Sequence, residues 1–254
     1  MTTIRSERHD GGVCVLTLDK PPANAIDERL LTDLERALET VAADATVRAV
    51  VLTGAGAFFC GGFDFAAPRR EDAVATDLYA LYRRTHLRLL TLAKPTLAMV
   101  NGHATAGGLV LVLACDSRLA AAGDARIGLN EVAVGAAFPR AAFEIVQLRL
   151  SHARATELIL GAALYPVADG VRLGVIEECL PAAELRATVL GRAARLGAFP
   201  RDAYAHAKSA LVREAAARIE AESDGEALAT MAVWLAPESR AARARQRARL
   251  GLER

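Results

Sequence analysis

The stretch "AGGLVLVLACD" (residues 106–116) joins two adjacent glycines to an uninterrupted apolar run. Gly107 and Gly108 follow a segment with the composition of a strand, and the apolar run is expected to begin a helix. Two glycines at such a junction allow backbone N–H groups to approach a ligand oxygen closely. Residues 109–112 offer no acid, base or nucleophile, so a site at this turn needs its proton chemistry from elsewhere in the chain.

The segments around this stretch alternate between short apolar runs and longer patterns with helical spacing. Asp27 is well placed to cap the first of the helical segments. The rhythm, with glycine-rich loops between elements, predicts an α/β core with ligand chemistry at the strand-to-helix turns. The expected strands are 11–19, 47–54, 95–102 and 116–122, and the expected helices are 27–44 and 71–93.

From about residue 139 onward the pattern is mostly helical, apart from "GVIEECL" (174–180). Two long helices are expected over 198–223 and 226–250. They are poorly placed to form a core of their own, and we expect them to pack against a neighbouring subunit. The arginines clustered in 239–254 favour a solvated terminal helix over a phosphate-binding stripe.

Composition narrows the class of protein. A chain of 254 residues that is 53% hydrophobic fits one large domain, or one domain with a helical appendage. Its 31 basic and 30 acidic residues lack the charge footprint of a nucleic-acid binder. The 4 cysteines have no metal-binding spacing, no hydrophobic signal segment opens the sequence, and no apolar run spans a bilayer. These features predict a cytoplasmic protein without membrane insertion and without a metal.

Two glycine-rich turns are candidates for binding negative charge. The turn "FCGGFDF" (59–65) follows the second expected strand, and "GHATAGG" (102–108) follows the third. If those strands are neighbours, the turns place two backbone N–H groups around one oxygen, an oxyanion hole in which each donor contributes about 3–4 kcal/mol. Glycines that only permit tight turns would explain the same pattern. His103, within the second turn, is expected to be structural, and no hydrolase, zinc-protease or phosphate-loop motif is present.

Glu131 is the one acid in residues 127–139, which are otherwise uncharged and mostly apolar. A carboxylate is costly to bury unless it is paired or used in catalysis. Desolvation would raise its pKa and make it a better base near neutral pH. An acid on an exposed turn would fit the same sequence, and periodicity leaves both interpretations open.

Five blocks of the sequence follow one another in a recognisable order. They are "NAID" (24–27), "VRAVVLTGAGAFFCGGFDF" (47–65), "NGHATAGG" (101–108), "ACDSRLAAAGDARIGLNEVAVG" (114–135) and "ELILGAALYPVADGVRLGVIEECLP" (157–181). Together they resemble the crotonase superfamily, the enoyl-CoA hydratase/isomerase family. The resemblance implies an α/β fold, a crotonase-like spiral of ββα units followed by a C-terminal α-helical region. We place these two parts at residues 1–195 and 196–254, the second serving oligomerisation.

The resemblance also implies a substrate and an assembly. Members act on acyl-CoA thioesters without a metal or redox cofactor, coenzyme A being part of the substrate, and form homotrimers or dimers of trimers. In the family's pattern Phe63 and Gly107 donate the two oxyanion N–H groups. Ala25, Gly61 and Asp64 fall where the family lines its channel for CoA and pantetheine.

The chain departs from the family's pattern in two places. "FAAP" (65–68) replaces the lysine and glutamate often found after the channel aspartate, and Arg69 and Arg70 are weak substitutes for phosphate contacts. Hydratases of the family hold and split water between two glutamates. The second matches Glu131, but the first falls on Val110, which we expect to line the substrate instead. A two-glutamate hydratase is therefore disfavoured.

One carboxylate suffices to move a proton along an acyl chain. Glu131 can remove a proton from C2 of a 3-enoyl-CoA, leaving a dienolate held by the N–H groups of Phe63 and Gly107, and return it at C4. This pattern resembles the Δ3,Δ2-enoyl-CoA isomerase branch of the family, and it is the mechanism we favour.

Three alternatives remain from the sequence. Hydratase activity could persist on Glu131 alone. A different reaction could use Asp64, Asp116 or Glu144, although Asp116 and Glu144 are expected to be structural. The protein could instead be a non-catalytic acyl-CoA binder, which the presence of an acid at position 131 mildly disfavours.

Overall fold

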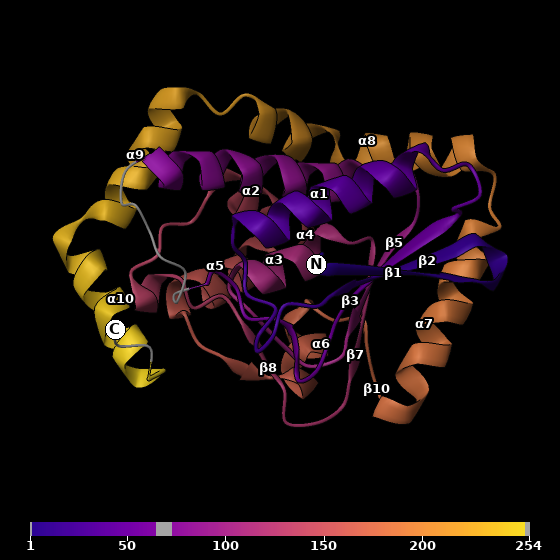
Figure 1. The fold of residues 1–254 in the computed structure, drawn as a ribbon, viewed down its shortest axis with the longest axis horizontal. Helices are drawn as coiled ribbons and strands as arrows, with labels where there is room; N and C mark the ends of the chain where they lie inside the picture. The colour runs from indigo at the N-terminus through magenta and orange to yellow at the C-terminus, as the bar shows by residue number, and fades with distance from the viewer. Residues whose placement is uncertain (1, 65–72, 252–254) are drawn as a thin grey trace.

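The computed structural model describes residues 2–64 and 73–251 and has a six-stranded sheet at its centre (Figure 1). The strand order is β1-β2-β3-β5-β7-β10, with β1 antiparallel to β2 and the remaining neighbours parallel. All four expected strands are therefore present and adjacent, and β1 and β10 extend the sheet at its two edges. The strands are β1 (Ile4–His9), β2 (Val13–Leu18), β3 (Ala49–Gly54), β5 (Thr96–Val100), β7 (Ser117–Ala121) and β10 (Glu178–Leu180).

A second, smaller sheet has the order β4-β6-β8-β9. Its first three strands are parallel, and β9 is antiparallel to β8. Strands of two or three residues are too short to show an alternating pattern, so the sequence does not reveal them. His103, in β6, accepts a hydrogen bond at Nδ1 from Arg126 N at 3.0 Å, the structural role expected of it. The strands are β4 (Phe58–Cys60), β6 (His103–Thr105), β8 (Arg126–Gly128) and β9 (Tyr165–Pro166).

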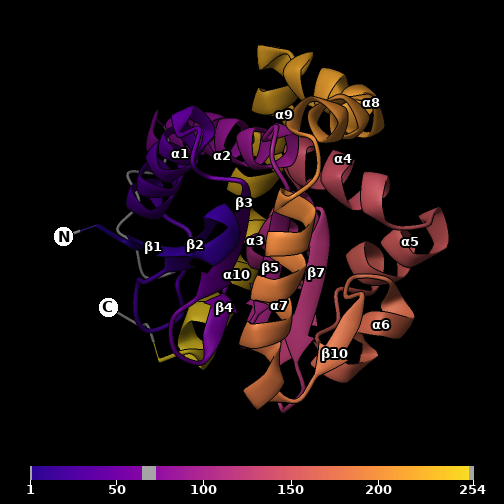
Figure 2. The ribbon, with the colours of Figure 1, turned by 90° about the vertical axis from the view of Figure 1, so that its right-hand side faces the viewer.

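Helices cover both faces of the larger sheet because its inner strands, β2, β3, β5 and β7, are apolar on both sides. On one face α7 (Ala182–Gly197) crosses the strands and buries Leu185, Val189 and Ala193 against them (Figure 2). The opposite face belongs to the main core, which includes buried residues of α1 (Glu28–Ala43), α3 (Gly107–Ala114) and α4 (Arg140–Arg149). Parallel sheets buried on both faces are typical of α/β folds.

The helix expected after the first strand begins where the sequence indicates. The Asp27 carboxylate accepts a hydrogen bond from Leu30 N at 2.8 Å, so it caps α1 and satisfies one free N–H of the first turn. The helix buries a stripe of leucines, including Leu34 and Leu38, against the core. The α2 helix (Ala73–Thr91) packs alongside it, and α8 (Arg201–Glu220) packs on α2 in turn (Figure 2). The α2 helix ends shortly before Pro95, in agreement with the predicted stop.

The prediction of a single helix over 226–250 is wrong. The chain forms α9 (Asp224–Leu235) and α10 (Pro237–Arg249), with extended backbone at Ala236 between them. Pro237 lacks an N–H and clashes with the preceding turn, so it starts a new helix instead of continuing the old one. The remaining helices are α5 (His152–Gly161) and α6 (Gly170–Leu173). The division into parts at residue 195 stays a prediction.

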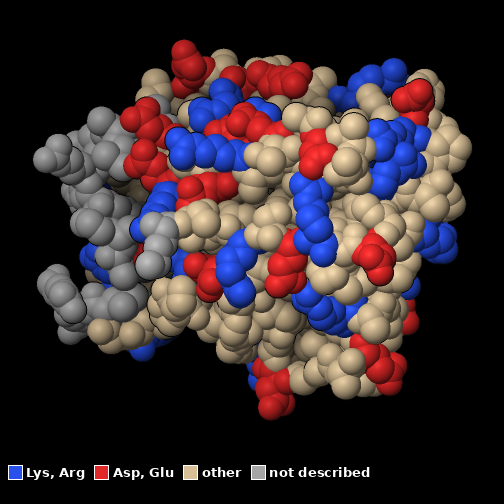
Figure 3. Space-filling model, turned by 45° about the vertical axis from the view of Figure 1, so that its right-hand side comes forward, with Lys and Arg blue, Asp and Glu red and all other residues tan. Residues whose placement is uncertain are grey.

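The surface carries charges of both signs. Figure 3 shows basic and acidic side chains interspersed over the face in view, in keeping with a net charge of +1. The late arginines are exposed as predicted, at Arg240, Arg245, Arg247 and Arg249, but Arg243 is buried. Within the described ranges, no helix is long and apolar enough to cross a membrane, and no group of three potential ligands is arranged to hold a metal.

Candidate active site

Three neighbouring strands of the smaller sheet each lead directly into a predicted site residue. Phe63 follows β4, Gly107 follows β6 and Glu131 follows β8. Because β4, β6 and β8 are parallel neighbours, their carboxyl ends meet at one edge of the sheet. The expected neighbours in the larger sheet, β3 and β5, also pair directly. The fold therefore gathers at one edge three residues that lie far apart in the sequence.

Two unused backbone donors stand at this edge. Gly107 opens α3, whose first N–H groups have no partner within the helix. Among the described residues, no hydrogen bond uses the N–H of Phe63 or of Gly107. The turns that carry them touch, because a Cβ on Gly62 would lie 2.7 Å from Ala106 Cβ and 3.4 Å from Gly107 N. Two free donors beside the positive end of a helix are suited to an oxyanion.

Glu131 is buried, so the exposed-turn interpretation is wrong. Only 4% of the residue is exposed, and Oε2 has no hydrogen-bond partner within the described part of the chain. Burial raises the pKa of the Glu131 carboxyl to about 8. Its main chain is held in place, since Glu131 O accepts a hydrogen bond from Ala136 N at 2.8 Å. A fixed carboxyl with a free oxygen and a pKa near neutrality can both take and return a proton.

Tyr82, in the middle of α2, contacts the other parts of the site. Its ring would lie 3.4 Å, and its hydroxyl 3.6 Å, from a Cβ placed on Gly107. The ring stacks on Phe63 at a centroid distance of 5.3 Å and on His86 at 3.7 Å. Burial and then the charge of Glu131 raise the pKa of the Tyr82 hydroxyl well above its usual value. These contacts of Tyr82 could not be predicted from the sequence, because the helix shows only an amphipathic pattern.

Comparison with known proteins assigns the family. A family model described as enoyl-CoA hydratase/isomerase matches residues 8–235. The chain belongs to this family. It is 27% identical over 218 residues to human mitochondrial enoyl-CoA delta isomerase 1, covering 85% of this chain and 72% of that protein. It is also 27% identical over 230 residues to the short-chain-enoyl-CoA hydratase of Clostridium acetobutylicum, covering 87% of this chain and 88% of that one.

The fold agrees with that assignment. The crystal structure of human mitochondrial Δ3-Δ2-enoyl-CoA isomerase superposes with a TM-score of 0.93 at 24% identity, covering 98% of each chain. The predicted crotonase fold and superfamily are therefore confirmed. Relatives named as isomerases and as hydratases are both present, so membership alone does not separate the two activities.

The predicted channel residues of this family member are arranged around a lysine. Lys20 Nζ donates to Asp64 Oδ2 at 2.6 Å and to Ala25 O at 3.0 Å, so these two predicted residues are brought together. Gly61 lies on the adjoining turn, where its N–H donates to Ala23 O at 2.9 Å. Lys20 was missed by sequence reasoning, although its place at the end of a strand near the Gly-rich loops could have suggested it.

Val110 lies in α3 with no exposed surface and belongs to the main core. It stands where the family resemblance would place the first hydratase glutamate, and the helix itself carries no acid. Its predicted role in lining the substrate stays a prediction. Arg69 and Arg70, the suggested phosphate contacts, lie outside the described residues.

The other acids considered from the sequence are paired. The Asp116 carboxylate forms an ion pair with Lys208 at 2.8 Å. Glu144 is buried and pairs with Arg218 at 2.6 Å. Both have the structural roles expected of them, and Glu131 alone among the acids weighed keeps an oxygen without a partner in the described chain.

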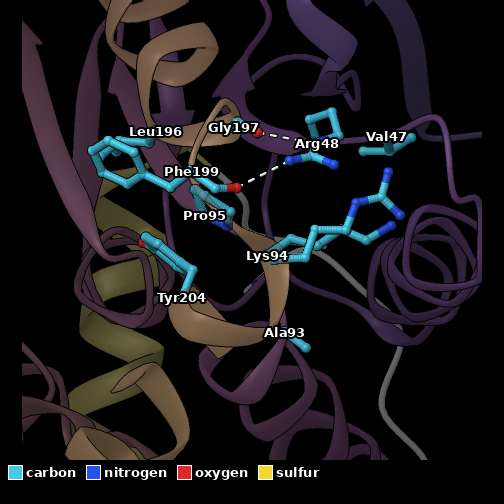
Figure 4. Close-up of a pocket in the computed structure, with 10 residues that line it drawn as sticks. Val47, Arg48, Ala93, Lys94, Pro95, Leu196, Gly197, Phe199 and Tyr204 are labelled. Carbon is cyan, nitrogen blue, oxygen red and sulfur yellow. Dashed lines mark hydrogen bonds between the residues drawn. The ribbon is translucent and has the colours of Figure 1, made fainter. Parts of the chain in front are cut away.

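A hollow at the opposite edge of the larger sheet, at the starts of β3 and β5, has a different explanation (Figure 4). Its basic side chains donate hydrogen bonds to the carbonyl groups at the ends of helices. Lys94 Nζ donates to Val41 O and Asp44 O, at the end of α1. Arg48 Nε donates to Gly197 O at 2.8 Å, at the end of α7. Cations near helix C-termini satisfy the last carbonyls and the helix dipole, so these charges need no ligand to account for them.

Proposed function

We propose that this protein is an enoyl-CoA isomerase that moves the double bond of a 3-enoyl-CoA to position 2. The observation that carries the proposal is Glu131, a buried carboxyl with one unpaired oxygen and a pKa of about 8. It lies at the sheet edge where Phe63 and Gly107 present unused N–H groups. A single acid beside an oxyanion hole matches the needs of a proton shuttle.

The proposed reaction has two proton transfers and no net gain or loss of atoms. The Glu131 carboxylate takes a proton from C2, and the electron pair of that C–H bond moves toward the thioester oxygen. The resulting dienolate accepts hydrogen bonds from the N–H groups of Phe63 and Gly107. The protonated Glu131 then returns the proton to C4, which leaves the double bond between C2 and C3. Because the donors meet the charge only as it develops, they favour the transition state over the substrate.

Hydration makes a different demand on the site. Adding water across the double bond requires a base for the water and a proton for C2. The position of one of those two glutamates in hydratases is held by the buried Val110. An apolar residue in place of that acid supports isomerisation over hydration.

The test compares 3-enoyl-CoA and 2-enoyl-CoA as substrates for the wild type, Glu131→Gln and Glu144→Gln. The third protein is a matched control, because Glu144 is also 4% exposed but is already paired with arginine. We expect 2-enoyl-CoA from the wild type and from Glu144→Gln, no 3-hydroxyacyl-CoA from either, and no turnover by Glu131→Gln. Products are separated by chromatography and identified by mass.

A reaction in D₂O adds a test of the shuttle itself. A carboxylic acid that is 4% exposed exchanges slowly with solvent, so part of the product should retain the original proton and gain no deuterium. Full deuterium incorporation at C4 would argue against a single shuttling group. Hydrated product from the wild type would instead indicate a hydratase, and thioester binding without turnover, unaffected by Glu131→Gln, would indicate a binding protein.

A further inference from the structure

The last two helices lie at one end of the molecule, opposite α7, and reach into the site (Figure 1). Trp234, near the end of α9, packs its ring edge-on against Phe63, with centroids 5.9 Å apart and planes at 65°. It completes a continuous row of four rings, in the order Trp234, Phe63, Tyr82 and His86. One end of this row therefore belongs to the C-terminal helices, and its second ring belongs to a proposed oxyanion donor.

Arg243, on α10, holds the tryptophan in place. Its guanidinium lies 4.2 Å from the centroid of the Trp234 ring, and Nη2 donates to Trp234 O at 2.6 Å. Nη1 donates to Gly135 O at 2.5 Å. The arginine is 8% exposed, so its charge has left most of its water and is stabilised by two carbonyls and a ring.

Gly135 belongs to the turn that carries Glu131. The turn closes through a hydrogen bond from Ala136 N to Glu131 O, and Gly135 has a φ of 66°. A Cβ at Gly135 would lie 2.6 Å from Ser239 O and 3.0 Å from Ala242 Cβ, so α10 sits directly on this turn. One guanidinium thus joins the turn of the proposed base to the tryptophan that packs on the proposed oxyanion donor.

We propose that Arg243 is a positioning residue that fixes the distance between the two halves of the site. The inference rests on the proposed isomerase function. Neither Arg243 nor Trp234 exchanges a proton with the substrate. Their effect is geometric, because a shuttle that serves both C2 and C4 depends on where the carboxyl stands relative to the held thioester oxygen. Arginine suits this task because its planar fork can donate in two directions at once, whereas lysine concentrates its charge at one nitrogen.

The test uses Arg243→Lys and Arg243→Met, with Arg245→Met as the matched control. Arg245 is an exposed arginine on the same helix, so its substitution removes the same charge without the contacts. Trp234 is the only tryptophan in the sequence, so tryptophan fluorescence reports on this site alone. The readouts are kcat and KM for 3-enoyl-CoA, and quenching of Trp234 emission by acrylamide. Circular dichroism selects the variants that remain folded.

We expect Arg243→Met to lower kcat about tenfold or more, with KM changed less than about threefold, and to increase quenching of Trp234. Arg243→Lys should fall between it and the wild type, and Arg245→Met should match the wild type. If Arg243→Met left both kcat and the quenching of Trp234 unchanged, the proposal would be overturned. A lower kcat without greater quenching, or greater quenching without a lower kcat, would overturn it as well. If Arg243→Met fails to fold, the milder Arg243→Lys decides by the same two readouts.

A failure of the isomerase proposal is distinguishable from a failure of this one. Wild-type protein that converts neither enoyl-CoA isomer would count against the isomerase. The positioning role would then be judged by Trp234 quenching together with the affinity for 2-butenoyl-CoA, measured by calorimetry. Weaker binding and greater quenching in Arg243→Met, with neither in Arg245→Met, would support the role. Unchanged binding would overturn it.

Discussion

Two acids with little exposed surface lie at strand ends of this chain and differ in almost every other respect: Glu131 is buried and Asp116 is half-buried. Asp116, just before β7, accepts hydrogen bonds at Oδ2 from Lys208 Nζ at 2.8 Å, Thr96 N at 3.0 Å and Tyr204 OH at 3.1 Å. Glu131, beyond β8, has an oxygen with no partner among the described residues. A buried acid with partners stabilises a fold, whereas an unpartnered one lowers stability and persists where it has another use. The comparison separates structure from function within one molecule.

The largest expected effect comes from Glu131→Gln, which should lower kcat by roughly 10²–10⁴-fold because it removes the proton shuttle. The same change should leave stability unchanged or raise it by up to about 3 kcal/mol at pH 7, since glutamine avoids the cost of keeping a buried acid protonated. Steady-state kinetics and urea unfolding check the two halves of the prediction. A stable but fully active variant would remove Glu131 from the mechanism.

Asp116→Ala should show the opposite pattern. Loss of this carboxylate leaves Lys208, which is 5% exposed, without its ionic partner, and breaking a buried pair costs about 3–5 kcal/mol. Activity per folded molecule should stay within about threefold of the wild type. Urea unfolding measures the loss, and a double-mutant cycle with Lys208→Met should show that the two effects are not additive. A large loss of kcat at full stability would mean that the region around Asp116 in the larger sheet is coupled to the catalytic edge of the smaller sheet.

Local and distant contacts also differ in how well they can be predicted from the sequence. The apolar runs and Asp27 as a helix cap predicted the larger sheet, and the glycine pattern singled out two turns that the fold brings together, because those features depend on local pattern. The choice of Phe63 and Gly107 as oxyanion donors came from the family resemblance and stays a prediction. Glu131 was identified from its apolar surroundings, but its burial was not. Whether an acid is buried depends on which distant elements cover it, and here α10 packs directly on the turn that carries Glu131.

Residues that act from a distance were the ones missed. Tyr82 and Arg243 reach the site from helices whose local patterns indicate only a packed face and a solvated end. The break at Pro237 was overlooked because the flanking residues keep a helical composition. The two-residue and three-residue strands of the smaller sheet, which aim all three proposed catalytic residues, carry too few residues for any periodicity. The candidate site residues could thus be named from the sequence more easily than the short strands and the helices that hold them in place.

The pH dependence of activity and stability should run in opposite directions through Glu131. Only the carboxylate can take a proton from C2, so kcat/KM should rise about tenfold per pH unit at low pH and level off near the Glu131 pKa of about 8. The folded state holds a proton that the unfolded chain releases near pH 4.5, the ordinary value for this group. Between these two values the unfolded state binds fewer protons, so the contribution of Glu131 to stability falls as pH rises.

Both trends are measured on the wild type and on Glu131→Gln. Kinetics from pH 5.5 to 9 gives the midpoint, and urea unfolding over the same range gives the stability slope. The slope assigned to Glu131 should disappear in the variant, while slopes from other groups remain. A kcat/KM that stays flat down to pH 5.5 would mean that the pKa of Glu131 in the free protein is close to the ordinary glutamate value, contrary to this prediction.

The smallest expected effects separate two tyrosines, each beside one of the two acids: Tyr82 is buried and Tyr204 is half-buried. Tyr204 donates to Asp116, so Tyr204→Phe should lower stability by about 1.5–3 kcal/mol, the usual contribution of a hydrogen bond to a charged group, and leave the pH profile of activity unchanged. Tyr82 has no such bond among the described residues, and phenylalanine keeps its ring between Phe63 and His86. Tyr82→Phe should therefore change stability by less than about 1 kcal/mol.

The effect of Tyr82→Phe should appear in catalysis instead. Its hydroxyl is a polar group near Gly107 and within the electrostatic reach of Glu131, so its removal leaves the ionised carboxylate in a more apolar environment. We expect the midpoint of the activity profile to move to higher pH and kcat at pH 7 to fall a few-fold, about 1 kcal/mol in the barrier. If Tyr204→Phe moved the midpoint and Tyr82→Phe did not, the division between a structural edge and a catalytic edge would be wrong.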